Sequence, residues 1–291
     1  MSNSNVTPAF VLRRSFIELD ARARAQSLLD AGTGRELVGP YERTESPWLP
    51  AQGAAPQSDD GCVVLKGTIA AKPVVVVALE GAFQAGSMGE VSGAKMTAAL
   101  DLAARDSANG RITAAVLLLE TGGVRLQEAN LGLAAIAEVI SSVLVLREHA
   151  PIITVIAGTV GCFGGMSLVA GVSSYVLMTR EARLGLNGAE VIEQESGIEE
   201  LDSSDRALIW AINGGEQRVG MGVADELVED DAKMIAASVR RYVEAGLPRT
   251  HRSDQIELYR QRIAALDVSK QFEPLMMRES WGKARQEGGV R

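Results

Sequence analysis

The chain has 291 residues, 46% of them hydrophobic and 23% charged, so it can bury a sizeable core and is not disordered over most of its length. Its formal net charge of −8 argues against general nucleic-acid binding, which needs a basic surface. No apolar run reaches the roughly 18–20 residues of a membrane span, and the first residues lack the features of a signal peptide. Two cysteines and two histidines favour reduced thiols in a cytoplasmic protein without a metal site.

The sequence predicts three parts. Residues 1–60 have the pattern of a peripheral arm, with a charged helix over 15–31. Residues 61–235 alternate apolar strands, glycine loops and helices, which indicates an α/β domain around a mostly parallel sheet with flanking helices. Residues 236–291 are mainly helical and carry 11 Lys and Arg against 7 Asp and Glu, or +4. This last part is a basic extension on an acidic body.

Within the α/β part, β-branched runs predict strands and apolar periodicity predicts helices. Strands are expected at 74–79, 114–119, 152–157, 174–178, 183–186 and 223–228, and helices at 91–108, 126–147, from 165 to 171, 205–213, 231–244 and 254–266. A glycine loop follows each of the first three strands. Because ligands bind at the carboxyl ends of parallel strands, the chemistry is expected in these loops.

Three glycine loops are candidates for a site. Gly86-Ser87-Met88-Gly89 precedes a helix and could bind an anion through its amides, although a tight turn explains it equally well. Gly122-Gly123 follows the second strand, and Gly164-Gly165 follows the third. Singly these pairs are also explained by a turn that begins a helix or by close packing, but together they could each supply one amide to a shared thioester oxygen, as an oxyanion hole does.

Side-chain catalysts are less evident than backbone donors. Neither histidine is in a favourable place, and Cys162 is expected to be a small buried hydrophobe. Carboxylates near the loops have the positions of loop or cap residues, namely Glu80, Glu90, Glu120, Glu128 and Glu190. Backbone donors with few side-chain catalysts fit an enolate intermediate, such as the one formed when a malonyl thioester loses carbon dioxide.

Four motifs, in this order and spacing, carry a family resemblance: Gly86-Ser87-Met88-Gly89 with Gly93-Ala94-Lys95, Thr121 to Glu128, Gly164-Gly165, and Val191-Ile192-Glu193-Gln194. Through them, residues from about 75 to 230 resemble the carboxyltransferase β-subunit family, a branch of the crotonase-like fold. The chain departs from the bacterial acetyl-CoA carboxylase members in three ways. It has no four-cysteine zinc ribbon, Lys95 stands where they usually have Arg, and Asn187-Gly188-Ala189 replaces a Gly-Pro-Arg-like turn.

With its N-terminal arm and basic tail, the whole chain is similar to the β subunits of biotin-independent malonate decarboxylases. That resemblance implies decarboxylation of a malonyl group on an acyl carrier protein, which yields acetyl-carrier and carbon dioxide. It also implies a γ subunit of similar fold and an α subunit that exchanges malonate for acetate on the carrier. The chain itself is expected to bind no cofactor, since the phosphoribosyl-dephospho-CoA prosthetic group is carried by the acyl carrier protein.

The resemblance also assigns site residues. The thioester oxyanion hole falls on the amides of Gly122, Gly123 and Val124, and the second donor falls on Gly164 or Gly165. Substrate binding and loop shaping fall on Gly86, Ser87, Met88, Lys95, Arg125, Gln127 and Glu128. The proton donor to the enolate is not assigned and is either water or a group of the γ subunit. Two alternatives stay open: a biotin-dependent acyl-CoA carboxyltransferase subunit, and a non-catalytic scaffold subunit.

Overall fold

The computed structural model describes residues 13–267 and 273–287. Seven strands form one sheet, and their order in the sheet is their order in the chain. They are β1 (Arg35–Leu37), β2 (Cys62–Ile69), β3 (Lys72–Leu79), β4 (Ala114–Leu118), β5 (Ile152–Ile156), β6 (Tyr175–Met178) and β7 (Glu226–Leu227). The β1–β2 and β2–β3 pairs are antiparallel, and every pair from β3 to β7 is parallel. The predicted α/β fold with a mostly parallel sheet is confirmed.

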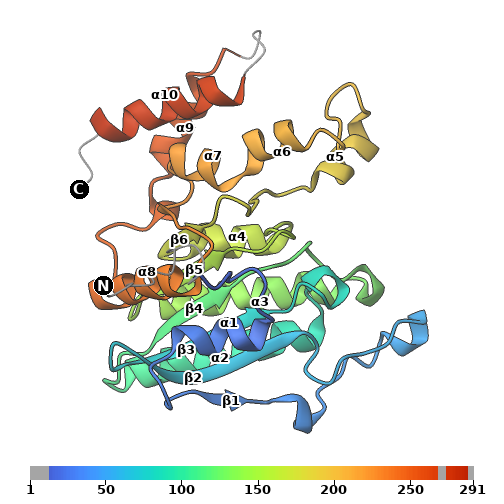
Figure 1. Ribbon diagram of the computed structural model, residues 1–291, viewed down its shortest axis with the longest axis vertical. Helices are drawn as coiled ribbons and strands as arrows, with labels where there is room; N and C mark the ends of the chain where they lie inside the picture. Colours follow the sequence, from blue (N-terminus) through green and yellow to red (C-terminus); the bar gives the residue numbers. More distant parts are fainter. Residues whose placement is uncertain (1–12, 268–272, 288–291) are drawn as a thin grey trace, which may run out of the picture.

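Helices cover both faces of this sheet (Figure 1). One layer consists of α1 (Ala21–Leu28) and α8 (Ala232–Ala245), and the other of α2 (Glu90–Ala108), α3 (Leu131–Leu146) and α4 (Gly165–Val172). Alternate side chains of β3 enter the two layers: Val75 and Val77 pack with α2 and α3, and Val74 and Val76 pack with α1 and α8. The central strands are therefore buried on both faces, which explains their continuous apolar sequence.

The remaining helices lie beyond β6, at the end of the molecule opposite β1 (Figure 1). They are α5 (Ala189–Ser196), α6 (Arg206–Asn213), α7 (Gly215–Gly220), α9 (Ile256–Ala264) and α10 (Pro274–Glu287). Of these, α6 and α9 were predicted individually and α10 lies in the extension that was predicted to be mainly helical, whereas α5 and α7 were not predicted. Within the described residues, no helix is long and apolar enough to cross a membrane.

Two predicted elements differ from the structure. The stretch 183–186 is not a strand of the sheet, because Arg183 and Leu184 form single bridges to Gly214 and Cys162. The helix expected at 126–147 begins at Leu131, since residues Leu126–Glu128 form a 3-10 turn that Ala129 ends with a positive φ of 49°. At residues 126–128 the ion pair of Glu128 with Arg125, described below, outweighs the local apolar pattern.

The segment before residue 61 contributes to both the core and the sheet. Helix α1 buries Ala21, Ala25 and Leu28 against the sheet, and β1 forms its edge. At the other predicted boundary, residue 235 lies inside α8, whose Ile235 and Val239 are 0% exposed. The arm and the extension thus pack against the same sheet as the part between them.

Candidate active site

The loops that leave β3, β4 and β5 are joined side by side at the carboxyl edge of the sheet. Parallel bridges link Met88 to Val124, Thr121 to Cys162, and Cys162 to Leu184. The two glycine pairs are therefore neighbours, as their shared position after parallel strands predicts. These bridges fix the backbone of the loops, so that the amide groups that take no part in them point in set directions.

In the first loop, two of the three expected donors are already engaged. The amide of Gly122 donates to the carbonyl of Ala85 (2.9 Å), and the amide of Gly123 donates to Oγ1 of Thr121 (3.1 Å). The amide of Val124 has no hydrogen-bond acceptor among the residues that the structure describes, while its neighbours Gly123 and Arg125 bond to Met88. Of the amides that the family resemblance assigns here, Val124 is the one left available to a ligand.

The second loop shows the same division of roles. Gly164 donates its amide to the carbonyl of Leu186 (2.8 Å), whereas the amide of Gly165 has no acceptor within residues 13–267 and 273–287. Gly165 is the first residue of α4, so its N–H also lies at the positive end of that helix dipole. This makes Gly165 the better candidate of the two for the second donor.

The loops touch through their glycines. A Cβ atom on Gly164 would lie 3.0 Å from Cα of Gly123, and both residues have positive φ angles, 62° and 125°. Side chains at these positions would separate the loops and strain the backbone. The contact lies beside the two available amides, one residue before Val124 and one before Gly165.

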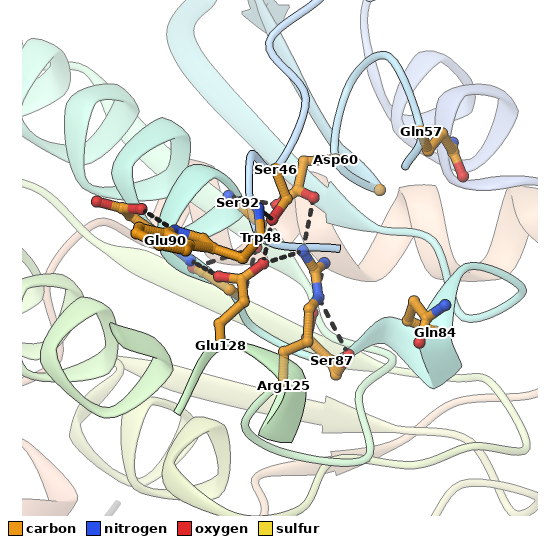
Figure 2. A network of polar contacts seen from close by, with 12 residues as sticks. Ser46, Trp48, Gln57, Asp60, Gln84, Ser87, Glu90, Ser92, Arg125 and Glu128 are labelled. Carbon is orange, nitrogen blue, oxygen red and sulfur yellow. Dashed lines mark hydrogen bonds and ion pairs between the residues drawn. The ribbon is translucent and has the colours of Figure 1, made fainter. Parts of the chain in front are cut away.

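A buried polar network of Asp60, Arg125, Glu128 and Ser46 supports the first loop (Figure 2). Nη1 of Arg125 pairs with Asp60 (2.6 Å) and Glu128 (2.9 Å), and Nη2 donates to the carbonyl of Ser87 (3.0 Å). Oγ of Ser46 donates to Glu128 (2.5 Å). The side chains of Arg125, Asp60 and Glu128 are at most 1% exposed, so the residue that follows Val124 is held rigidly.

The network perturbs both carboxyl groups. Burial raises the pKa of Asp60, an effect that its contact with Arg125 opposes. Burial also acts to raise the pKa of Glu128, but hydrogen bonds from Ser46, from the Glu90 amide (2.7 Å) and from Arg125 outweigh it and lower that pKa. Glu128 is therefore an ionised structural anchor with little capacity to transfer a proton.

Several residues predicted to bind substrate are part of this scaffold. Arg125 and Glu128 are buried, Ser87 accepts from Arg125, and Met88 is 0% exposed. Gly86 is buried as well. Their side chains shape the loop, as the resemblance implies, and do not line an open surface.

Lys95 and Gln127 have different surroundings. Lys95 is 7% exposed and its Nζ donates to the carbonyls of Asp59 (2.9 Å) and Cys62. The charge of Lys95 is therefore used inside the fold, and its side chain is not part of an exposed basic surface. Gln127 is exposed, and its side-chain amide contacts Gln84 at 3.3 Å.

Cysteine and histidine are poorly placed for catalysis. Burial raises the pKa of the Cys162 thiol, and it raises that of Cys62 to about 12, so neither forms a thiolate at neutral pH. His149 follows α3 and His251 contacts Arg147 at the end of that helix, at the amino edge of the sheet. Within the described residues, no group of three or more His, Cys, Asp or Glu side chains could hold a metal ion.

Two members of the network could not be found from the sequence. Asp60 and Ser46 lie 65 and 82 residues before Arg125 and Glu128 respectively, and no spacing rule connects positions so far apart. Both come from the segment interpreted as a peripheral arm and its boundary. The arm is thus part of the support of the candidate site.

Comparisons with known proteins show what the chain as a whole is similar to. The family model described as carboxyl transferase domain matches residues 19–269. A chain of the Pseudomonas malonate decarboxylase hetero-tetramer in complex with malonate is 55% identical, with a TM-score of 0.91 over 93% of this chain and 98% of that one. A chain of the Pseudomonas MdcD–MdcE hetero-dimer is 51% identical, with a TM-score of 0.75 over 89% and 100% of the two chains. The malonyl-S-ACP:biotin-protein carboxyltransferase MADC of Malonomonas rubra is 38% identical, over 94% of this chain and 90% of that protein.

Proposed function

Because the chain belongs to the carboxyl transferase domain family, we propose that it is the β subunit of a cytoplasmic malonate decarboxylase. Its substrate is a malonyl thioester on an acyl carrier protein, and its products are the acetyl thioester and carbon dioxide. The observation that carries the proposal is the pair of unengaged amides, Val124 and Gly165, on two adjoining glycine loops. The 55% identity to a chain of the Pseudomonas enzyme supports the choice of substrate.

The proposed reaction needs stabilisation of one oxygen. The amides of Val124 and Gly165 donate to the thioester carbonyl oxygen. The bond between the malonyl carboxylate carbon and Cα breaks, its electron pair moves into the enolate, and the negative charge develops on that oxygen. The hole donors stabilise this charge, with each donor contributing roughly 3–4 kcal/mol in a serine protease. Protonation of Cα, by water or by a group of the partner subunit, then gives the acetyl thioester.

The proposed assembly contains a γ subunit of similar fold, an α subunit and the acyl carrier protein, whose phosphoribosyl-dephospho-CoA group carries the malonyl unit. The related Pseudomonas chains occur in a hetero-dimer and a hetero-tetramer. Exposed leucines lie close to the two loops along the chain: Leu126 (81% exposed), Leu168 (52%) and Leu186 (59%). A γ subunit that covers these side chains would limit the access of bulk solvent to the enolate.

The test is carbon dioxide release from a malonyl thioester by this chain co-purified with its partner subunits, with and without avidin. Release that avidin does not change is the expected result. Absence of release by an intact complex would contradict the proposal and favour a scaffold role. Loop variants that assemble and still react would also favour the scaffold role, because the chemistry would then lie in the partner.

A second candidate is transfer of the malonyl carboxyl group to a biotin protein. It is favoured by the 38% identity to the Malonomonas rubra biotin-protein carboxyltransferase, which spans nearly the whole chain. Both reactions pass through the same enolate, so the candidate oxyanion hole serves either. Avidin separates them, since inhibition by avidin is expected if the carboxyl group is transferred to biotin.

A further inference from the structure

A buried ion pair lies directly behind the first glycine loop. Glu120 is the residue before Thr121-Gly122-Gly123, and its carboxylate pairs with Nη1 of Arg24 on α1. Each residue is 7% exposed. Arg24 also donates to the carbonyls of Phe16 (3.0 Å) and Ile17 (2.6 Å), so its guanidinium is fixed by the N-terminal segment.

Alternation along β4 explains why Glu120 meets α1. Val116 and Leu118 face the α1–α8 layer, and Leu117 and Leu119 face the opposite layer. Glu120 continues the first series and therefore points toward α1. Its contact with Arg24 is set by the pleat of the strand.

The same carboxylate also reaches the second loop. Oε1 of Glu120 accepts from the amide of Val160 at 3.4 Å. Gly158 leaves room for it, because a Cβ atom there would overlap the carboxyl group. Gly161, the residue after Val160, accepts the amide of Thr121 (2.8 Å). Glu120 thus contacts the chain where it leaves β5 and starts the loop that leaves β4.

We propose that Arg24 and Glu120 are positioning residues for the oxyanion hole. They hold the bases of both loops in one arrangement, which directs the amides of Val124 and Gly165 toward a single oxygen. Catalytic groups must be held within a fraction of an ångström, and a misplacement of about 1 Å can cost a hundredfold in rate. Neither side chain contacts the substrate. The inference rests on the proposed function, which supplies the oxygen to be bound.

The contribution of the Arg24–Glu120 pair to the stability of the protein can be measured separately from its contribution to the arrangement of the loops. Removing one partner leaves a buried charge without its counterion, which is strongly destabilising. Replacing both partners with apolar residues of similar volume is often neutral or stabilising. A purely structural pair would therefore regain full activity in the double variant. A positioning pair would not, because the thioether introduced by Glu120→Met is a poor acceptor for the Val160 amide.

The experiment compares the wild-type complex with complexes that contain Arg24→Met, Glu120→Met, the double variant, or Glu120→Gln. Tm is measured first, and kcat and KM for carbon dioxide release are then measured well below the Tm of each complex. We expect kcat of the double variant to fall by roughly 10- to 100-fold with KM within about threefold. Glu120→Gln keeps an acceptor for Val160 and should recover part of kcat.

Arg252→Met is the matched control. Arg252 pairs with Asp225 (2.5 Å) and its side chain is 11% exposed, but the pair lies at the amino end of β6, where Asp225 accepts from Val176. We expect a lower Tm and an unchanged kcat. Wild-type kcat in both the double variant and Glu120→Gln would overturn the inference, as would an equal loss of kcat in the control. A wild-type complex that releases no carbon dioxide would instead refute the proposed function.

Discussion

Proline at position 124 should remove one proposed hole donor with little damage to the loop. The ladder bonds around Val124 use the carbonyl of Gly123 and the amide of Arg125, both to Met88 at 2.8 Å. The amide of Val124 itself has no acceptor in the described chain, so Val124→Pro breaks none of these bonds. A proline is tolerated where the N–H points away from the neighbouring strand.

The expected loss follows from the role of a single donor. Removing one oxyanion-hole hydrogen bond costs about 2.7–4 kcal/mol in transition-state stabilisation, or roughly 10²–10³ in kcat. Val124→Ala is the matched variant, since it keeps the amide and removes the same side chain. We therefore expect Val124→Pro to react at least about a hundredfold more slowly than Val124→Ala.

Single-turnover release of carbon dioxide from the malonyl carrier, in complexes of verified composition and Tm, measures this difference. Equal rates for the proline and alanine variants would refute the assignment of the Val124 amide. If Val124→Pro is slow and its Tm is strongly lowered, its KM shows whether the loop is damaged. An intact loop should give a KM close to that of Val124→Ala.

Three further predictions concern the surroundings of the hole. Gly165→Val places a Cβ 2.7 Å from the Ile136 side chain, which should push α4 away from α3. We expect turnover to be abolished while the circular dichroism spectrum stays native. Normal turnover of this variant would contradict the prediction. Glu128 has a lowered pKa in the folded chain, so the stability that its charge contributes is present above its unfolded pKa and is lost as pH falls through its folded pKa. The difference in Tm between wild type and Glu128→Gln should therefore narrow from pH 7 to about pH 3. A difference in Tm that stays constant over this range would contradict the prediction. Lys95→Met should cost about 1–3 kcal/mol of unfolding free energy, because it leaves two carbonyls without a donor. Affinity for the acyl carrier protein in a binding titration should be unchanged, and weaker carrier binding would contradict the purely structural role of Lys95.

The sheet and the place of the glycine loops could be predicted from local sequence. The runs at 74–79, 114–119 and 152–157 predicted β3, β4 and β5 within two residues, because strands buried on both faces have continuous apolar sequence. The loops could be placed because they follow those strands directly. Strands β1 and β2 and helices α5 and α7 were missed, since their sequences mix apolar residues with polar residues or glycine.

The choice among neighbouring amides could not be made from sequence. In the sequence, Gly122, Gly123 and Val124 are equally able to donate a backbone amide. What distinguishes them is whether the folded chain supplies an acceptor for each amide. Ala85 engages one and Thr121 another, and these contacts exist only in the folded chain. The ion pairs Arg125–Asp60 and Arg24–Glu120 are of the same kind, as they join segments 65 and 96 residues apart.

The matching order of strands in chain and sheet bears on how the molecule is assembled during synthesis. From β2 to β7, each new strand pairs with the one made just before it, so the sheet can grow from one edge as the chain leaves the ribosome. Helix α1 is made first, but its neighbour α8 and the bond from the Ala232 amide to the Arg14 carbonyl come more than 200 residues later. Until α8 emerges, one face of the sheet stays partly uncovered, and transiently exposed apolar surface of this kind is prone to aggregation.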